Sequence, residues 1–108
     1  MPLTISPSTP YPGLRLLTVV GELDLGTAEA VREALTDAVK STDVDAVLID
    51  LEGLTFLDST GIGVLVAGWR SATDSGKRLR VDKAHGMALE VMRITGVWPH
   101  LNGEADAG

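Results

Sequence analysis

The residues from Val44 to Leu51, VDAVLIDL, restrict the possible folds of this chain more than any other stretch. They form a nearly continuous run of β-branched residues and leucine that is interrupted only by acidic positions. Such a run is typical of a strand buried on both faces, as in parallel sheets whose crossover helices cover both sides. The run therefore predicts a parallel strand in the middle of an α/β sheet.

Segments on both sides of this run give an alternating order of strands and helices. The predicted strands are Leu3–Ser6, Leu14–Val20, Val44–Leu51 and Leu79–Ala84, with a possible short one at residues 97–101. Apolar residues at helical spacing predict helices at about Thr27–Lys40, Thr60–Thr73 and Gly86–Thr95. Thr27 is a candidate N-terminal cap, while Gly76 and Gly96 are expected to end helices.

This order predicts a single α/β domain over residues 1–108, with a frayed tail from about residue 100. The sheet is expected to be mixed and mostly parallel, with four to five strands and about three helices. Its first strand should pair antiparallel with the second because only a short proline-rich loop separates them. The later strands should be parallel because helices connect them.

Composition excludes several classes of function. Nine basic against fifteen acidic residues give a net charge of -6, which argues against nucleic-acid binding and against adhesion to anionic lipid. There are no cysteines, no apolar run long enough to cross a membrane and no signal-peptide pattern at the N-terminus. We therefore expect a cytoplasmic protein without direct membrane insertion, whose acidic surface suits a basic protein partner or simply serves solubility.

The motif FLDSTGIG, Phe56 to Gly63, carries the candidate chemistry, and enzyme readings of it fail on spacing. A hydrolase elbow needs glycine two residues before its serine, where this chain has Leu57. The motif has one residue too many for an aspartic-protease turn, and it lacks the lysine of a phosphate-binding loop. Weak nucleotide contact at the helix N-terminus stays open. We predict no enzyme activity and no cofactor.

Other polar side chains near the motif do not define a catalytic or metal site. The two histidines, His85 and His100, are expected at the surface and not as a base for Ser59. Four acidic residues could gather at one end of the sheet, but no spacing identifies a metal site. They are Glu22, Asp24, Asp50 and Asp58.

Two roles remain for the polar residues of the motif, and they are compatible. Asp58, Ser59 or Thr60 should cap the helix that follows, since short polar side chains satisfy its free N–H groups. A hydroxyl at the same helix end can also accept a phosphate, which adds about -1.5 to -2 charges. The helix dipole favours such a charge by about 0.3–1 kcal/mol, so phosphorylation should alter the surface without unfolding the domain.

The segments VVGELDLGTAEAVREAL and VLIDLEGLTFLDSTGIGVLV resemble the bacterial anti-sigma factor antagonists of the STAS domain family, from about Leu14 to Trp98. The resemblance implies partner switching. The unmodified protein binds an anti-sigma factor that is also a serine kinase, which frees a sigma factor for stress-response or sporulation-type transcription. The kinase then phosphorylates the serine after the motif aspartate, here Ser59, and a PPM-type phosphatase removes the phosphate.

The resemblance also implies roles for residues around that serine. Asp58 would position the hydroxyl or engage the kinase, Thr60 would cap the helix, and Gly61 would let the partner approach closely. Asp24 would belong to the same docking face. The apolar centre of that face is expected from Ile62 and Val91.

STAS domains also serve as structural or interaction modules, and this gives the alternative function. Relatives occur as subunits of lipid-transport ABC complexes and of stress-signalling assemblies. Many of the lipid-transport relatives lack the acceptor serine, so the intact sequence D-S-T-G at residues 58–61 favours the switch.

Overall fold

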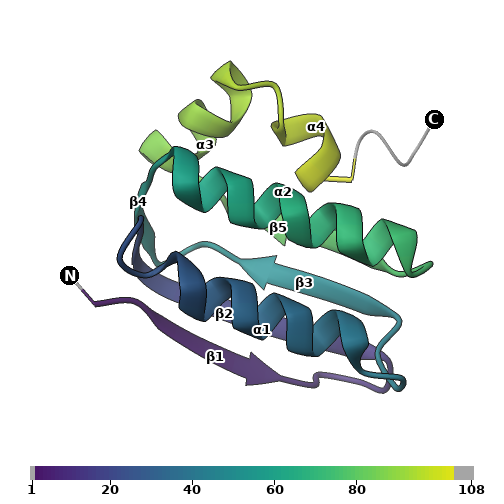
Figure 1. Cartoon of the computed structure of the whole chain (residues 1–108). Coiled ribbons are helices and arrows are strands. Elements are labelled where there is room, and N and C mark those ends of the chain that lie inside the picture. The colour runs from purple at the N-terminus through teal and green to yellow at the C-terminus, as the bar shows by residue number, and fades with distance from the viewer. Residues whose placement is uncertain (1, 104–108) are drawn as a thin grey trace.

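The computed structural model describes residues 2–103 as a five-stranded sheet with helices packed on it (Figure 1). In chain order the elements are β1 (Thr4–Ser8), β2 (Leu14–Leu23), α1 (Ala28–Lys40), β3 (Ala46–Asp50), β4 (Leu54–Leu57), α2 (Ser59–Asp74), β5 (Arg78–Asp82), α3 (Gly86–Ile94) and α4 (Trp98–Leu101). The predicted α/β class and the predicted number of strands are confirmed.

The sheet is mixed, as predicted. Four strands lie in the order β1-β2-β3-β5. The fifth strand, β4, is outside this order and pairs with the carboxyl end of β2. β1 is antiparallel to β2, while the pairs β2–β3, β3–β5 and β2–β4 are parallel. Helical connections explain the parallel pairs because each crossover returns the chain to the same end of the sheet.

Within residues 2–103, helices cover only one face of this sheet, so the prediction that the central strand is buried on both faces is wrong. In β3, Val47 and Ile49 are buried, whereas Ala46 and Leu48 on the opposite face stay half-exposed. In Figure 1, α1 and α2 lie together on the near side of the strands. The described chain measures 32 × 32 × 20 Å, and the short dimension fits one sheet with one layer of helices.

The core lies between the sheet and this helical layer. The apolar stripe of α1 supplies Val31 and Leu35, and α2 supplies Leu65. Gly68 of α2 lets the two helices approach, because a Cβ there would lie 2.8 Å from Leu35 Cδ1. The remaining core is mostly Leu, Val and Ile from the sheet, as the strand pattern predicts.

Three local predictions differ from the structure. The chain forms a short strand, β4, in a segment that is not among the predicted strands. The possible last strand is instead the helix α4, whose second residue is Pro99, and proline suits a first helical turn because its missing N–H has no partner there. Leu101 is fully buried, so the chain is anchored beyond residue 100. Residues 104–108 of the predicted tail lie outside the described residues.

Candidate functional site

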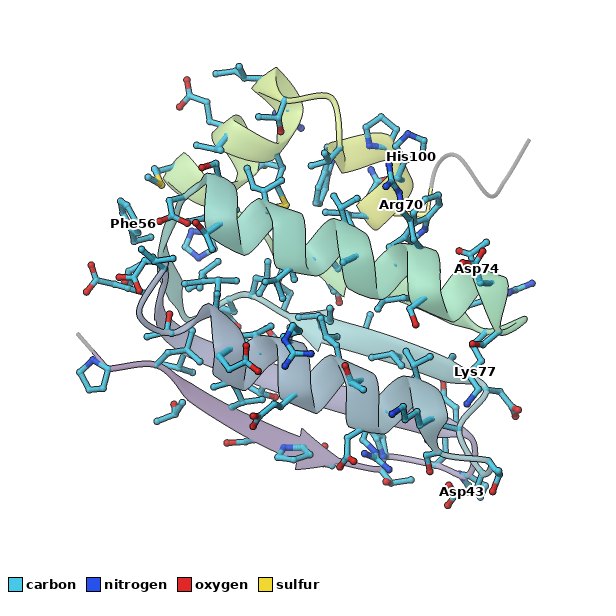
Figure 2. All side chains as sticks on the ribbon, viewed as in Figure 1. Asp43, Phe56, Arg70, Asp74, Lys77 and His100 are labelled. Carbon is cyan, nitrogen blue, oxygen red and sulfur yellow. The ribbon has the colours of Figure 1, made fainter. Side chains whose placement is uncertain are left out.

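The motif residues lie where β4 ends and α2 begins, next to the loop that leads from β2 into α1. Figure 2 shows Phe56 of β4 at this end of the molecule, far from Lys77 and Asp43 at the opposite end. The amide of Asp58 donates a hydrogen bond to the carbonyl of Leu23 at 3.3 Å. This bond joins the start of α2 to the end of β2 and so brings the two loops side by side.

Asp58 caps α2. Its Oδ1 accepts a hydrogen bond from the amide of Gly61 at 3.0 Å, while its carbonyl accepts the amide of Ile62 at 3.0 Å. Its extended backbone is the conformation that a cap residue requires. The prediction that Thr60 provides the cap is therefore wrong. Thr60 is half-buried one position inside the helix.

Ser59 is the first residue of α2 and is exposed. Among residues 2–103, its hydroxyl makes no hydrogen bond. The capping interaction is supplied by Asp58, so the Ser59 hydroxyl is free to react with a group that approaches from solvent. The positive end of the helix macrodipole lies at this position and favours a negative charge there.

Gly61 and Ile62 face inward. A Cβ at Gly61 would lie 2.7 Å from both Leu23 Cγ and Leu57 Cδ1, so this glycine lets the first turn of α2 rest on the ends of β2 and β4. Ile62 is only 8% exposed and belongs to the core. Gly61 therefore serves internal packing, and neither residue presents a side chain at the outer surface.

Asp24 organises the neighbouring loop. Its Oδ1 accepts hydrogen bonds from the amides of Gly26 at 2.9 Å and Thr27 at 3.2 Å. The Thr27 hydroxyl donates to the carbonyl of Glu22 at 2.7 Å and accepts from the amide of Asp24 at 3.0 Å. Thr27 occupies the N-cap position of α1 as predicted, but its side chain does not cap the helix. Together these bonds hold the loop in one conformation beside Ser59.

Leu25 is the residue that sequence reasoning missed. It sits at the tip of this loop with 79% of its surface exposed. A large apolar side chain between the acid and the glycine of D-L-G was the available signal. Val91 of α3, by contrast, is half-buried and packs against the core. Leu25 is thus the most exposed large apolar side chain among residues 2–103.

Neither histidine is placed to activate Ser59. His85 Nε2 lies 2.7 Å from the carbonyl oxygen of Glu52, and the His100 ring packs on Trp69 with centroids 5.0 Å apart. No group of three or more His, Asp or Glu within residues 2–103 is arranged to hold a metal ion. The acidic residues considered above therefore do not converge on a metal centre in this part of the chain.

One carboxylate with a shifted pKa lies at the far end of the molecule from the motif. The Ser41 hydroxyl hydrogen-bonds the exposed Asp43 carboxylate and lowers the pKa of Asp43 below its ordinary value. Asp43 lies at the end of the molecule opposite Phe56 (Figure 2).

In the part of the chain that is described, no helix is both long and apolar enough to cross a membrane.

Comparison with known proteins places this chain in a family. The family model described as "Mlab, STAS domain" matches residues 15–98. An anti-sigma F factor antagonist of Paenibacillus polymyxa is 23% identical over 86 residues, which cover 80% of this chain and 74% of that protein. An anti-sigma-B factor antagonist of Listeria monocytogenes is 32% identical over 79 residues, covering 73% of this chain and 68% of that protein.

A solved structure agrees with this assignment. The crystal structure of an anti-sigma factor antagonist from Mycobacterium paratuberculosis superposes with a TM-score of 0.73 at 27% identity, over 88% of this chain and 79% of that one. The chain belongs to the STAS domain family, and its relatives include anti-sigma factor antagonists.

Proposed function

We propose that this protein is a cytoplasmic anti-sigma factor antagonist whose partner binding is switched off by phosphorylation of Ser59. The unmodified form binds an anti-sigma factor that is a serine kinase and thereby permits sigma-factor-dependent transcription, in stress-response or sporulation-type signalling. The kinase modifies Ser59, and a PPM-type phosphatase restores the hydroxyl. The protein acts as a binding module and not as an enzyme. The exposure of Ser59 beside a cap that another residue provides is the observation that carries this proposal.

The docking face proposed for the kinase combines one apolar side chain with acidic groups. Leu25, 79% exposed, would insert into an apolar pocket of the partner. Asp24 and Asp58, both half-buried, would define the surroundings of the Ser59 hydroxyl. Gly61 and Ile62 would support this face from below, and Val91 would act through its packing in α3.

The proposed switch depends on added charge and not on refolding. Phosphate brings about -1.5 to -2 charges next to the carboxylates of Asp24 and Asp58. The helix N-terminus tolerates the new charge within the protein, but a partner surface fitted to a neutral hydroxyl must desolvate it. A charge buried without a partner at an interface costs about 2–5 kcal/mol, which weakens binding by about 30-fold or more.

Mass spectrometry after incubation with candidate anti-sigma kinases and ATP tests the modification. We expect one phosphate on Ser59, no phosphate on Ser59→Ala, and full phosphorylation of Thr60→Ala. The Thr60→Ala variant is the matched control because it removes the adjacent hydroxyl and leaves the Asp58 cap in place. Phosphate on Thr60, or on no residue with any kinase tested, would count against the proposal.

Calorimetric titration with the kinase that modifies the protein tests the switch itself. Ser59→Ala should bind about as tightly as the unmodified protein, whereas Ser59→Asp should bind at least about 30-fold more weakly. Leu25→Ala should weaken binding by at least about tenfold without changing stability, because its side chain is already in solvent. Co-purification with an ABC-type ATPase, together with no effect of Ser59→Asp, would favour the lipid-transport alternative.

A further inference from the structure

The face of the sheet opposite the helices carries an apolar patch with charged side chains at one edge. The register of the parallel strands places its residues in three rows. We call this surface the open face, and its rows are Leu14–Ala46–Arg78, Leu16–Leu48–Arg80 and Thr18–Asp50–Asp82. Each row runs from β2 through β3 to β5, so the first two rows are apolar except at the β5 edge.

These apolar side chains have no partner layer among the described residues. Leu14, Leu16, Ala46 and Leu48 are half-exposed, and none of them belongs to the core or packs against it. Sheets built entirely of parallel strands occur almost only where both faces are covered, and here β2, β3 and β5 pair parallel. An uncovered parallel face is therefore an incomplete arrangement, which a second layer of protein would complete.

The surface of this patch is hollowed. A cavity of about 240 Å³ lies between α1 and α2, but a second one of about 230 Å³ lies on the open face. The latter is lined by apolar residues of β2 and β3 together with Tyr11, Arg78 and Arg80. Tyr11 is 63% exposed and stands at the rim of this hollow. The patch therefore offers both an apolar floor and room for inserted side chains.

The charges on the open face are separated along the strand direction. Arg78 lies at the amino end of β5 and Asp82 lies at its carboxyl end on the same face. Within residues 2–103, Arg78 forms no ion pair, and Arg80 reaches only the carbonyl oxygen of Asn102, at 3.4 Å. On β5, Arg78 thus marks a basic end and Asp82 an acidic end, with Arg80 between them, while leucine fills the middle row on β2 and β3.

We propose that the open face binds a second copy of this chain, as a symmetric dimer of two sheets packed face to face. The two-fold axis lies between the two sheets and runs along the row Leu16–Leu48. It therefore makes the strands of the two copies antiparallel. It sets Leu48 on Leu48 and Arg80 beside Arg80, and it brings Arg78 of each copy opposite Asp82 of the other. Such isologous pairing makes every contact twice, so one charge pair gives two ion pairs. The helices, and Ser59 with them, stay on the outside.

The size of the apolar patch indicates how tightly the two copies can bind. Strands about 4.8 Å apart, with a rise of about 3.3 Å per residue, give a patch of roughly 15 Å on each side. This is smaller than the roughly 800 Å² per partner of a standard stable interface. We therefore expect a weak dimer that forms only at high protein concentration.

Sedimentation equilibrium from low to high micromolar concentration measures this association. The unmodified protein should shift from monomer to dimer, and Leu48→Lys should weaken dimerisation by at least about tenfold. Arg78→Asp and Asp82→Arg should each weaken it by a similar factor, while the double variant should recover most of the affinity. Arg93→Asp is the control, because it removes the same charge from an exposed position on α3.

Circular dichroism establishes that each variant is folded, and the two surface charge variants keep the test valid if Leu48→Lys does not fold. A protein that stays monomeric at all concentrations would overturn the proposal. A dimer unaffected by these substitutions would show that another surface is used. Loss of affinity in both single charge variants without recovery in the double variant would overturn the antiparallel two-fold arrangement.

Discussion

Gly61 and Gly63 stand two residues apart in the first turns of α2, but their surroundings differ. Gly61 is buried against Leu23 and Leu57, and it gives α2 the close approach that brings Ser59 beside the Asp24 loop. Gly63 is exposed, and a Cβ added there would meet nothing within 4 Å. Two effects can therefore be measured separately. At Gly61 the packing requires a small residue, whereas at Gly63 glycine only weakens the helix.

Substituting each glycine by alanine should change stability in opposite directions. Gly61→Ala forces its Cβ into Leu23 and Leu57, so we expect a loss of about 1–3 kcal/mol in the free energy of unfolding. Gly63→Ala should gain about 0.5–1 kcal/mol, because alanine is the better helix former and the site is open. Urea denaturation measures both. Equal effects of the two substitutions would contradict the close packing at Gly61.

At the scale of elements, one side chain joins two segments at the end of the molecule opposite the motif. Lys77, which precedes β5, donates from Nζ to the carbonyls of Val39 and Ser41 at the end of α1, the latter at 2.6 Å. The last carbonyls of a helix receive no hydrogen bond from within the helix, so these two can accept from Lys77. The negative end of the helix dipole also favours a cation there. Lys77 thus fixes the end of α1 to the start of β5 (Figure 2).

Removing this cation should destabilise the fold more than removing a neighbouring one. Lys77→Met keeps most of the aliphatic stem but loses both hydrogen bonds, so we expect the free energy of unfolding to fall by about 1–3 kcal/mol. Lys40→Met is the control, since Lys40 is exposed in the last turn of α1 and should matter by about 0.5 kcal/mol or less. Chemical denaturation compares them, and similar losses would argue against the Lys77 bridge.

For the whole molecule, the arrangement separates three surfaces. The proposed switch lies at the start of α2, the covered face carries the core, and the open face points away from the helices. Ser59 belongs to none of the packed surfaces, and its hydroxyl bonds to no described residue. A charge added at Ser59 should therefore alter the outer surface while the rest of the domain keeps its structure.

Phosphorylation at Ser59, or the substitution Ser59→Asp, should leave the global fold unchanged. The favourable dipole term is about 0.3–1 kcal/mol and the nearby carboxylates oppose it, so the melting temperature should move by less than about 4 °C. In amide NMR spectra, the changed signals should be confined to residues 24–27 and 58–62. Shifts throughout the core, for example at Leu17 and Leu65, would indicate a rearrangement and contradict the charge mechanism.

Much of this fold was predictable because local patterns decide it. The apolar stripe of α1, the glycine after α2 with φ +74°, and the hairpin of β1 with β2 all follow from residues that are close in sequence. The exposure of Ser59 was also expected from its place at a helix start. Each of these features depends on interactions within one or two turns or across one short loop.

Other features depend on what lies far away in the chain. Thr60 and Asp58 both suit a helix cap by residue type. In the structure Asp58 is the cap, and its amide also bonds to the carbonyl of Leu23 in β2, which is distant in sequence. β4 is only four residues long and forms by pairing with the end of β2, while α4 is held by the burial of Leu101. Leu25 gains its importance only because its loop is brought beside Ser59.

By itself the sequence determined most of the order of strands and helices, except β4 and α4, and the family motif, because periodicity and capping chemistry act locally. Only the tertiary structure decided that Gly61 and Ile62 face inward, that Leu25 faces outward and that one side of the sheet lacks a cover. The run at Val44–Leu51 is equally apolar for either arrangement, so its pattern cannot say how many faces are buried. That number depends on where the helices pack, which is a property of the whole chain.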